Sequence, residues 1–191
     1  MPRNLNGQLK FIRFVEDLTR AVYTTPRVGV PVTIRPLLAG LIAEDDWLPP
    51  EFCATNPNNY CQYLLYRDPS KKFSIVSFAW LAGQSTPVHD HTVWGAIGQL
   101  RGIECSTPFQ HAESGGLRAG HTTFSRPGDV ISFTPEHGDI HKVSNPGPET
   151  AVSVHVYGAD IGTLPRSKYD EASGEATTFI SGYTNSIAML V

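Results

Sequence analysis

From residue 60 onward the chain is a series of short segments rich in β-branched and aromatic residues, separated by residues that favour turns. The turn signals are dense, as in RPGD (126–129) and NPGPE (145–149). Many strands with close turns and few helices between them favour an antiparallel sandwich or barrel. The β-rich segments are YCQYLLYR (60–67), KFSIVSFAWLAG (72–83), VWGAIGQLRG (93–102), GHTTFSR (120–126), DVISFTP (129–135), HKVSN (141–145) and TAVSVHVYG (150–158).

The residues before this β-rich region have a helical pattern. Residues 5–22 carry apolar side chains at near-helical spacing with charged residues between them, which predicts an amphipathic helix. A second helix is predicted at roughly residues 34–45, before Pro49 and Pro50 break the chain. We therefore expect one all-β dominated domain with N-terminal helices packed outside it. Its parts are a helical region (1–58), a barrel core (59–170) and a wrapping C-terminal segment (171–191).

Composition narrows the class of partner. At 191 residues the chain can bury a sizeable core without a metal or a disulfide. Charged residues are 17% and the net charge is -3, so neither disorder nor electrostatic binding of nucleic acid is indicated. Three cysteines without a CxxC pair favour reduced thiols. No run of about 18 apolar residues and no leader-like opening is present. We expect a cytoplasmic protein that acts on a small molecule, without a membrane or nucleic-acid partner.

Two histidines stand one residue apart in the segment TPVHDHTVWGAIGQLRG (86–102). In a strand, residues i and i+2 share a face, so His89 and His91 can point at one atom while Asp90 points away. Imidazole is a good ligand for iron, zinc, copper or nickel. Two ligands seldom make a specific site, so a third is expected from another segment.

His141 is the best candidate for the third ligand, because it follows a glycine turn and begins a predicted strand. His137 could replace it only if the turn between the two curls inward. The remaining candidates, His111 and His121, are interpreted as structural residues.

A further histidine, His155, lies in a predicted strand in which polar and apolar residues alternate. Ser153, His155 and Tyr157 would share one face of this strand, and Val154 and Val156 the other. One interpretation is a half-exposed strand whose polar face meets water. The other is a small barrel in which the polar face lines the interior.

Two glycine and histidine patterns resemble the motifs of the cupin family. The first runs from Gly83 through the two histidines to Gly102, and the second from Gly128 through Pro135, Gly138 and His141 to Asn145. The resemblance implies a cupin-type double-stranded β-helix, also called a jelly roll. The glutamate of the first cupin motif is missing, since residues 92–96 read TVWGA.

A trio of neutral imidazoles without a carboxylate leaves the full charge of a divalent ion uncompensated. Such a centre favours an anionic ligand that enters with the substrate. A thiolate is suitable, because metal binding strongly lowers the pKa of a thiol.

The order of motifs over residues 60–170 resembles the thiol dioxygenase family, the cysteine dioxygenase group within the cupins. The features that match are Tyr60-x-Gln62-x-Leu64, Trp80, the HDH triplet, His141 and the Ser153–Tyr157 strand. The resemblance implies that Fe(II) is held by His89, His91 and His141. It also implies that the Tyr157 hydroxyl lies beside the iron and that His155 and Ser153 orient it. Mammalian-type members join this tyrosine to a cysteine, but Gly95 and Ala96 stand in that region here, so no crosslink is predicted.

The resemblance also addresses the substrate. Cysteine dioxygenases commonly have an arginine where this chain has Gln62, and a glutamine cannot form a charged bidentate clamp on a carboxylate. The Gln-type branch resembles 3-mercaptopropionate dioxygenase, which makes this acid and O2 the expected substrates. Arg166 is the alternative carboxylate donor, although a surface arginine beside a proline loop has the same pattern. Tyr60 could line the pocket or simply pack.

Two other functions remain open. An L-cysteine dioxygenase would use the same machinery. A non-catalytic cupin that binds a metal or ligand, or a zinc-dependent isomerase, would share the fold and differ in chemistry. Trp80 and Trp94 are expected in the core rather than in contact with a substrate.

Overall fold

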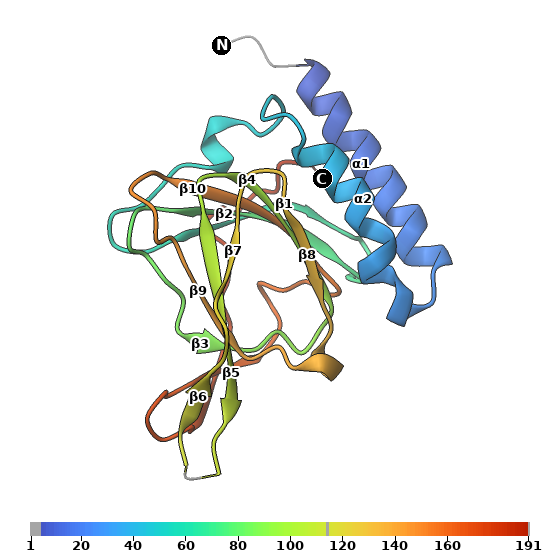
Figure 1. Cartoon of the computed structure of the whole chain (residues 1–191). Coiled ribbons are helices and arrows are strands. Elements are labelled where there is room, and N and C mark those ends of the chain that lie inside the picture. The colour runs from blue at the N-terminus through green and yellow to red at the C-terminus, as the bar shows by residue number, and fades with distance from the viewer. Residues whose placement is uncertain (1–4, 114, 191) are drawn as a thin grey trace.

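The computed structural model describes residues 5–113 and 115–190, and shows two antiparallel sheets with two helices on one side (Figure 1). The first sheet has the strand order β1 (Cys61–Arg67), β2 (Ser74–Trp80), β10 (Ala151–Tyr157), β4 (Gly95–Arg101) and β8 (Val130–Phe133). The second has the order β12 (Ala176–Phe179), β11 (Arg166–Tyr169), β3 (Val88–His89), β9 (His141–Ser144), β5 (Glu104–His111) and β6 (Leu117–Ala119), with β7 (Thr123–Ser125) also paired to β5.

The chain alternates between the two sheets as it advances. After β2 it crosses to β3, returns to β4 and crosses again to β5; β8, β9, β10 and β11 repeat the alternation. The second pass fills the gaps of the first, since β10 lies between β2 and β4, and β9 between β3 and β5. This connectivity is that of a double-stranded β-helix, so the predicted all-β jelly roll with outer helices is confirmed.

Both predicted helices are present on the outside of the first sheet (Figure 1). Helix α1 (Leu5–Thr24) buries the predicted apolar stripe, including Phe11, Phe14 and Leu18. Helix α2 (Val30–Ile42) begins earlier than predicted. Its early start is physically reasonable, because Pro31 lies in the first turn, where a missing N–H costs nothing. Neither helix, within the described residues, has the length and apolar character required to span a membrane.

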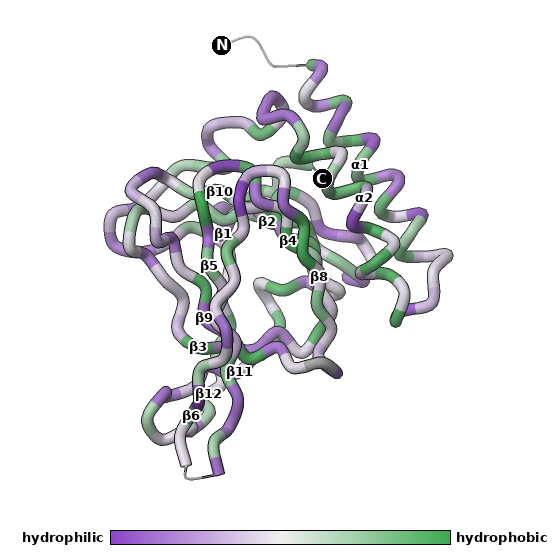
Figure 2. Tube along the Cα trace, viewed as in Figure 1, coloured by the Kyte–Doolittle hydropathy of each residue, from purple (hydrophilic) through white to green (hydrophobic). Residues whose placement is uncertain are grey.

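Helix α2 packs closely on strand β4. A Cβ atom on Gly98 would lie 2.9 Å from Ile42 Cδ1 and 3.0 Å from Leu38 Cγ, so only glycine lets the helix approach this far. In Figure 2 the strands beside α2 are largely hydrophobic, whereas α1 alternates along its length. The core between helices and sheet includes Val152, Val154 and Val156 of β10.

The packing of the helices decides between the two interpretations of β10. All seven of its residues are buried. Its valine face meets the helices, while Tyr157 belongs to a second apolar cluster with Phe78, Trp80 and Ile161. The half-exposed interpretation is therefore wrong, because the polar face of Ser153, His155 and Tyr157 is buried inside the barrel while the helices cover the valine face.

The seven predicted β-rich segments each contain a strand, but sequence patterns missed others. Strand β5, with the sequence ECSTPFQH, contains a proline and few apolar residues, so it lacks the usual strand pattern. It extends with β6 into a hairpin that projects from the barrel (Figure 1). No β-rich segment is predicted over strand β11. Strand β12 lies in the predicted wrapping segment and pairs with β11. The short 3-10 helices are η1 (Arg27–Gly29), η2 (Pro50–Phe52) and η3 (Pro135–His137).

Candidate metal centre

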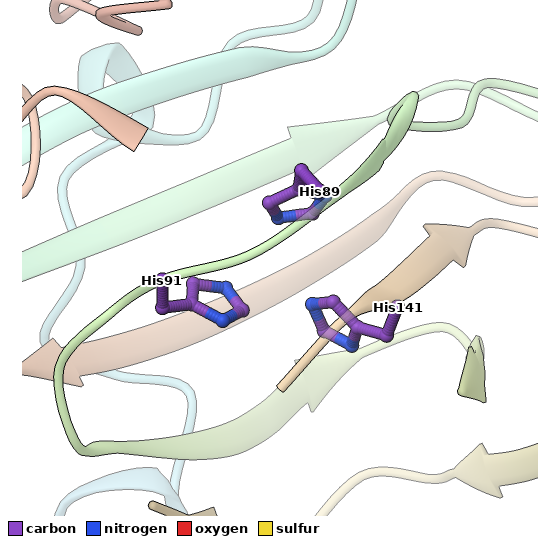
Figure 3. Close-up of side chains that lie close together, drawn as sticks. All are labelled: His89, His91 and His141. Carbon is purple, nitrogen blue, oxygen red and sulfur yellow. The ribbon is translucent and has the colours of Figure 1, made fainter. Parts of the chain in front are cut away.

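The imidazoles of His89, His91 and His141 lie close together (Figure 3). His89 ends β3, and His141 begins β9 directly opposite it in the antiparallel register. His91 follows two residues after His89. The candidate ligand atoms of the three side chains all lie within 4.8 Å of one another. The structure therefore brings together the three predicted ligands, while the side chain of His137 is outside the described part.

The expected strand geometry holds for His89 only. Strand β3 ends there, and Thr92 has a φ of 59°, so His91 lies in a tight turn. The carboxylate of Asp139 stabilises this turn, since it accepts hydrogen bonds of 2.9 Å from the backbone N–H groups of His91 and Thr92. The position of His91 thus depends on a loop almost fifty residues further along the chain.

Asp90 points away from the centre, as predicted. Its two carboxylate oxygens accept hydrogen bonds from the backbone N–H of Ser167 and from the hydroxyl of Tyr169, at 2.9 and 2.8 Å. Both partners are on β11. The aspartate between the histidines therefore joins β3 to its neighbour and is not a metal ligand.

The hydrogen bonds of the rings fit a metal site. His89 Nδ1 donates to the Pro87 carbonyl at 3.0 Å, and His141 Nδ1 is 2.8 Å from Ser106 Oγ. The Nε2 atom of His141 and the Nδ1 atom of His91 are both inaccessible to solvent and have no hydrogen bond. Tying one ring nitrogen while leaving the other free is the usual arrangement of histidine ligands. The free Nε2 of His141, whose Nδ1 is tied to Ser106, lacks a partner that a cation would provide.

The electrostatics also favour a cation. Burial lowers the pKa of His89 to about 4, against a hydrogen bond to Pro87 that raises it. Burial likewise holds the pKa values of His91 and His141 well below the ordinary value of 6.5. All three imidazoles are therefore neutral near pH 7 and keep a lone pair for a metal.

The trio has no carboxylate in it. Among the described residues, the group with metal-ligand geometry consists of the three histidines alone. Asp139 Oδ2 is 4.0 Å from His91 Nδ1 and already accepts two backbone hydrogen bonds. Within residues 92–96, the region without a glutamate, Gly95 lies opposite Tyr157, and a Cβ there would lie 2.3 Å from the Phe133 ring. A bound divalent ion would keep its full charge.

Ser153, His155 and Tyr157 form a continuous buried chain of hydrogen bonds beside the histidines. Ser153 Oγ is 2.7 Å from His155 Nε2, and His155 Nδ1 is 2.8 Å from the Tyr157 hydroxyl. The Tyr157 ring stacks on His91 with centroids 5.4 Å apart. Burial lowers the pKa of His155 to about 3 and raises the pKa of Tyr157 above its ordinary range, so both groups are neutral.

A small pocket opens onto this centre. Its enclosed volume is only about 20 Å³, and the empty space of about 320 Å³ includes its open mouth. The lining includes Tyr60, Gln62, His89, Tyr157, Arg166 and Phe179. One of the three histidines, the relay tyrosine and all three predicted substrate-binding residues thus share one cavity.

Arg166 is buried at the start of β11, with 5% of its surface exposed, so its interpretation as a surface arginine is wrong. Its guanidinium donates hydrogen bonds to Ser181 Oγ at 2.9 Å and to the Asp90 carbonyl at 3.4 Å. It lies over the Phe179 ring, 4.7 Å from the ring centroid. Its Nε has no hydrogen bond. No aspartate or glutamate in the described residues forms a salt bridge with it. Burial lowers its pKa, yet an arginine remains charged near pH 7.

Gln62 is buried, but its amide is largely occupied. Its Nε2 donates to the Gly182 carbonyl at 2.9 Å and to Ser181 Oγ at 3.3 Å, which uses both of its N–H groups. It could bind a carboxylate only by releasing one of these bonds. Tyr60 does both things considered for it, since it lines the pocket and stacks on Trp80 at 4.5 Å. Trp80 and Trp94 are buried, as predicted.

Sequence reasoning missed several residues that position this site. Ser106, which holds His141, lies in the unrecognised strand β5, and Asp139 is one acidic residue in a loop. Ser181, which contacts both Arg166 and Gln62, follows β12. No local pattern marks these residues, because their roles come from contacts between distant segments.

No protein-family model matches the chain. Among solved structures, a cupin superfamily protein from Desulfitobacterium hafniense DCB-2 aligns with a TM-score of 0.46 and 16% identity, over 61% of this chain and 94% of that one. A protein with a double-stranded β-helix domain from Klebsiella pneumoniae aligns with a TM-score of 0.44 and 16% identity, over 67% and 90% of the chains. An oxalate oxidase aligns with a TM-score of 0.43 and 18% identity, over 55% of this chain and 53% of that one. From its own strand connectivity, this chain is a double-stranded β-helix protein with a candidate centre of three histidines.

Proposed function

We propose that this protein is a non-haem Fe(II) thiol dioxygenase that oxidises a small mercapto acid, 3-mercaptopropionate, to its sulfinic acid. The observation that carries this proposal is one small cavity lined both by a buried arginine, which forms no salt bridge within the described residues, and by a histidine of a carboxylate-free trio. These two features match the two ends of a mercapto acid. The carboxylate would meet Arg166, and the sulfur would lie toward His89, His91 and His141.

The reaction needs only the thiol and O2. Two S–O bonds form, the S–H and O–O bonds break, and both oxygen atoms end on sulfur with the proton on the sulfinic acid. Sulfur loses four electrons and O2 gains them. When bound, Fe(II) supplies the one-electron chemistry that lets O2 react with a thiol, and the protein supplies binding and orientation.

Charge balance favours an acid without an amino group. A mercapto acid bound as thiolate and carboxylate has two negative charges, which suit a divalent ion and Arg166. The lining of the cavity contains no aspartate or glutamate that could pair with an ammonium group. L-cysteine would therefore bring a positive charge without an anionic partner, which costs binding free energy when the charge is desolvated.

Tyr157 has a role at the sulfur end. Tyr157 lines the cavity with His89, and its hydroxyl is held by His155. A phenol in this position can donate a hydrogen bond to the oxygen atoms being transferred. His155 and Ser153 fix its direction. Gln62, whose N–H groups are used by Ser181 and Gly182, would support the cavity wall and leave the carboxylate to Arg166.

The test is oxygen uptake by the full chain reconstituted with Fe(II) under anaerobic conditions. We expect thiol-dependent uptake, faster with 3-mercaptopropionate than with L-cysteine, and a sulfinate that carries two heavy atoms when ¹⁸O2 is supplied. Faster turnover of L-cysteine would instead indicate an L-cysteine dioxygenase. Tightly bound zinc with no thiol-dependent uptake after iron loading would indicate a non-catalytic or zinc-dependent cupin.

A further inference from the structure

Glu104 is a buried carboxyl group that the site described above does not use. It begins β5 and has 4% of its surface exposed. Its carboxyl faces three neutral side chains from the first sheet, namely Ser153 on β10, Gln99 on β4 and Trp80 on β2. A buried carboxyl group without a cation nearby is costly in its ionised form, so its presence at the end of a hydrogen-bonded chain calls for an explanation.

The polar atoms around Glu104 are incompletely paired. Oε1 of Glu104, Oε1 of Gln99 and Nε1 of Trp80 are all inaccessible to solvent and have no hydrogen bond. Ser153, by contrast, is already linked through His155 to Tyr157. Glu104 therefore lies beside Ser153, which is the end of the relay remote from Tyr157.

We propose that Glu104 is a positioning residue whose protonation state sets the direction of every hydrogen bond in the relay, and so decides whether the Tyr157 hydroxyl donates into the cavity. The effect on turnover rests on the proposed function, whereas the effect on the relay does not.

The protonated state orients the chain outward. A neutral Glu104 donates to Ser153 Oγ, and the Ser153 hydroxyl then donates to His155 Nε2. His155 carries its single proton on Nδ1 and donates it to the Tyr157 oxygen. The phenol hydrogen is left free to point into the cavity, where an oxygen atom can accept it.

The ionised state reverses each bond. The carboxylate of Glu104 accepts from the Ser153 hydroxyl, so Ser153 Oγ accepts from His155 Nε2–H. The free lone pair of His155 Nδ1 then accepts the phenol hydrogen of Tyr157. In this state the hydroxyl presents only lone pairs to the cavity and cannot stabilise a developing negative charge there.

The titration behaviour of the groups agrees with this geometry. Burial raises the pKa of Glu104 to about 7, against the polar side chains of Ser153, Gln99 and Trp80 beside it, which lower it. His155 stays neutral throughout, because burial lowers its pKa to about 3. A change at Glu104 therefore appears in His155 as a change of tautomer and not of charge.

The experiment reads the His155 tautomer directly in the metal-free full chain labelled with ¹⁵N-histidine. Two-dimensional ¹H–¹⁵N spectra are recorded from about pH 5 to about pH 9, together with the carboxyl ¹³C signal of Glu104. We expect the proton to lie on Nδ1 below a midpoint near pH 7 and on Nε2 above it, in step with the Glu104 titration. Because no metal or thiol is present, this outcome is independent of whether the protein oxidises thiols.

Three variants make the experiment decisive. Glu104→Gln should abolish the tautomer change, and Ser153→Ala should abolish it while the carboxyl of Glu104 still titrates. Glu113→Gln, an exposed glutamate near the tip of the hairpin, should leave the change intact. With Fe(II) and 3-mercaptopropionate, the fall of kcat above neutral pH should disappear in Glu104→Gln.

A proton shared with Gln99 instead of Ser153 would contradict the proposal. Oε1 of Gln99 is a competing acceptor for the proton of Glu104. If the proton goes there, His155 keeps one tautomer while Glu104 titrates, and the proposal is wrong. Persistence of the tautomer change in Glu104→Gln would also overturn it. Absence of turnover with every thiol would contradict the proposed function and leave the tautomer result standing.

Discussion

Arg166 is the residue whose surroundings say most about the ligand. A buried guanidinium normally pairs with a carboxylate, but this one contacts a hydroxyl, a carbonyl and an aromatic ring, and it faces a cavity. An anion in the cavity would supply the missing charge. The same residue has no distinguishing local pattern, so its importance follows from burial.

Removal of this charge gives the first prediction. In Arg166→Gln we expect kcat/KM for 3-mercaptopropionate to fall about ten- to a hundred-fold, since hydrogen bonds to charged groups contribute about 1.5–3 kcal/mol. The control substrate is 2-mercaptoethanol, which has no carboxylate and should lose little activity. Equal losses for both thiols would show that Arg166 acts on the fold and not on the carboxylate.

Ser106 provides a prediction about metal affinity. Its hydroxyl is 2.8 Å from Nδ1 of His141 and orients that ring. We expect Ser106→Ala to weaken binding of Fe(II) or Zn(II) about ten-fold or more, the usual effect of losing a group that orients a ligand. The matched control is Thr107→Ala, because the Thr107 hydroxyl bonds Thr122 instead. Titration with a competing chelator measures the metal affinity of both variants. Equal metal affinities in Ser106→Ala and Thr107→Ala would contradict the role of Ser106.

Glu104 also predicts a pH dependence of stability. Its pKa is raised from 4.5 to about 7 by burial, so the folded state binds more protons than the unfolded state in that window. Its contribution is fully present below pH 4.5 and is lost as pH rises through about 7, by about 3 kcal/mol. Urea unfolding across this range should show a slope that Glu104→Gln lacks and Glu113→Gln retains. If the free energy of unfolding had the same pH dependence in wild type and in Glu104→Gln, the predicted contribution of Glu104 would be wrong.

At the scale of elements, the contact between α2 and β4 positions the whole first sheet. Gly98 lets Leu38 and Ile42 lie against the strand. We expect Gly98→Val to lower the free energy of unfolding by about 1–3 kcal/mol through overpacking. Gly40→Ala, in α2 with nothing within 4 Å of the added Cβ, should instead raise it by about 0.5–1 kcal/mol. Denaturant unfolding of both variants checks the pair, and a neutral Gly98→Val would mean that the helix is free to move away.

The C-terminal segment has an element-scale role as well. Asn185 exchanges hydrogen bonds of 2.8 and 2.9 Å with the backbone of Leu64, and Leu190 N–H donates to the Leu65 carbonyl. These bonds cover the free edge of β1 and carry Ser181 toward Gln62 and Arg166. The segment therefore joins the outer strand to the wall of the cavity.

At the scale of the whole molecule, we expect the fold not to depend on a metal. Two apolar clusters, one between helices and sheet and one inside the barrel, surround the site without including the metal trio. We expect the chelated protein to unfold cooperatively and metal at 100 times Kd to add about 2.7 kcal/mol, or ~5–10 °C in Tm. Calorimetry with and without metal measures this difference. Loss of cooperative unfolding on chelation would show that the centre is structural.

Much of this fold was predictable because its signals are local. Alternation with period two predicted the shared face of Ser153, His155 and Tyr157, and turn residues separated the strands that contain them. Spacing alone predicted less for His91, which reaches the centre from a turn that Asp139 stabilises. Strand β5 was missed, because its register with β9 and not its own composition makes it a strand.

The sequence by itself determined which chemistry the chain carries, since residue identity and short spacings depend only on neighbouring residues. Three imidazoles, a serine–histidine–tyrosine strand and a barrel of short strands all follow from that local information. Only the tertiary structure decided that His89 pairs with His141, that Arg166 is buried beside the cavity, and that Glu104 lies beside Ser153. Burial and hydrogen bonding between distant segments set these relations, and they exist only once the two sheets have closed.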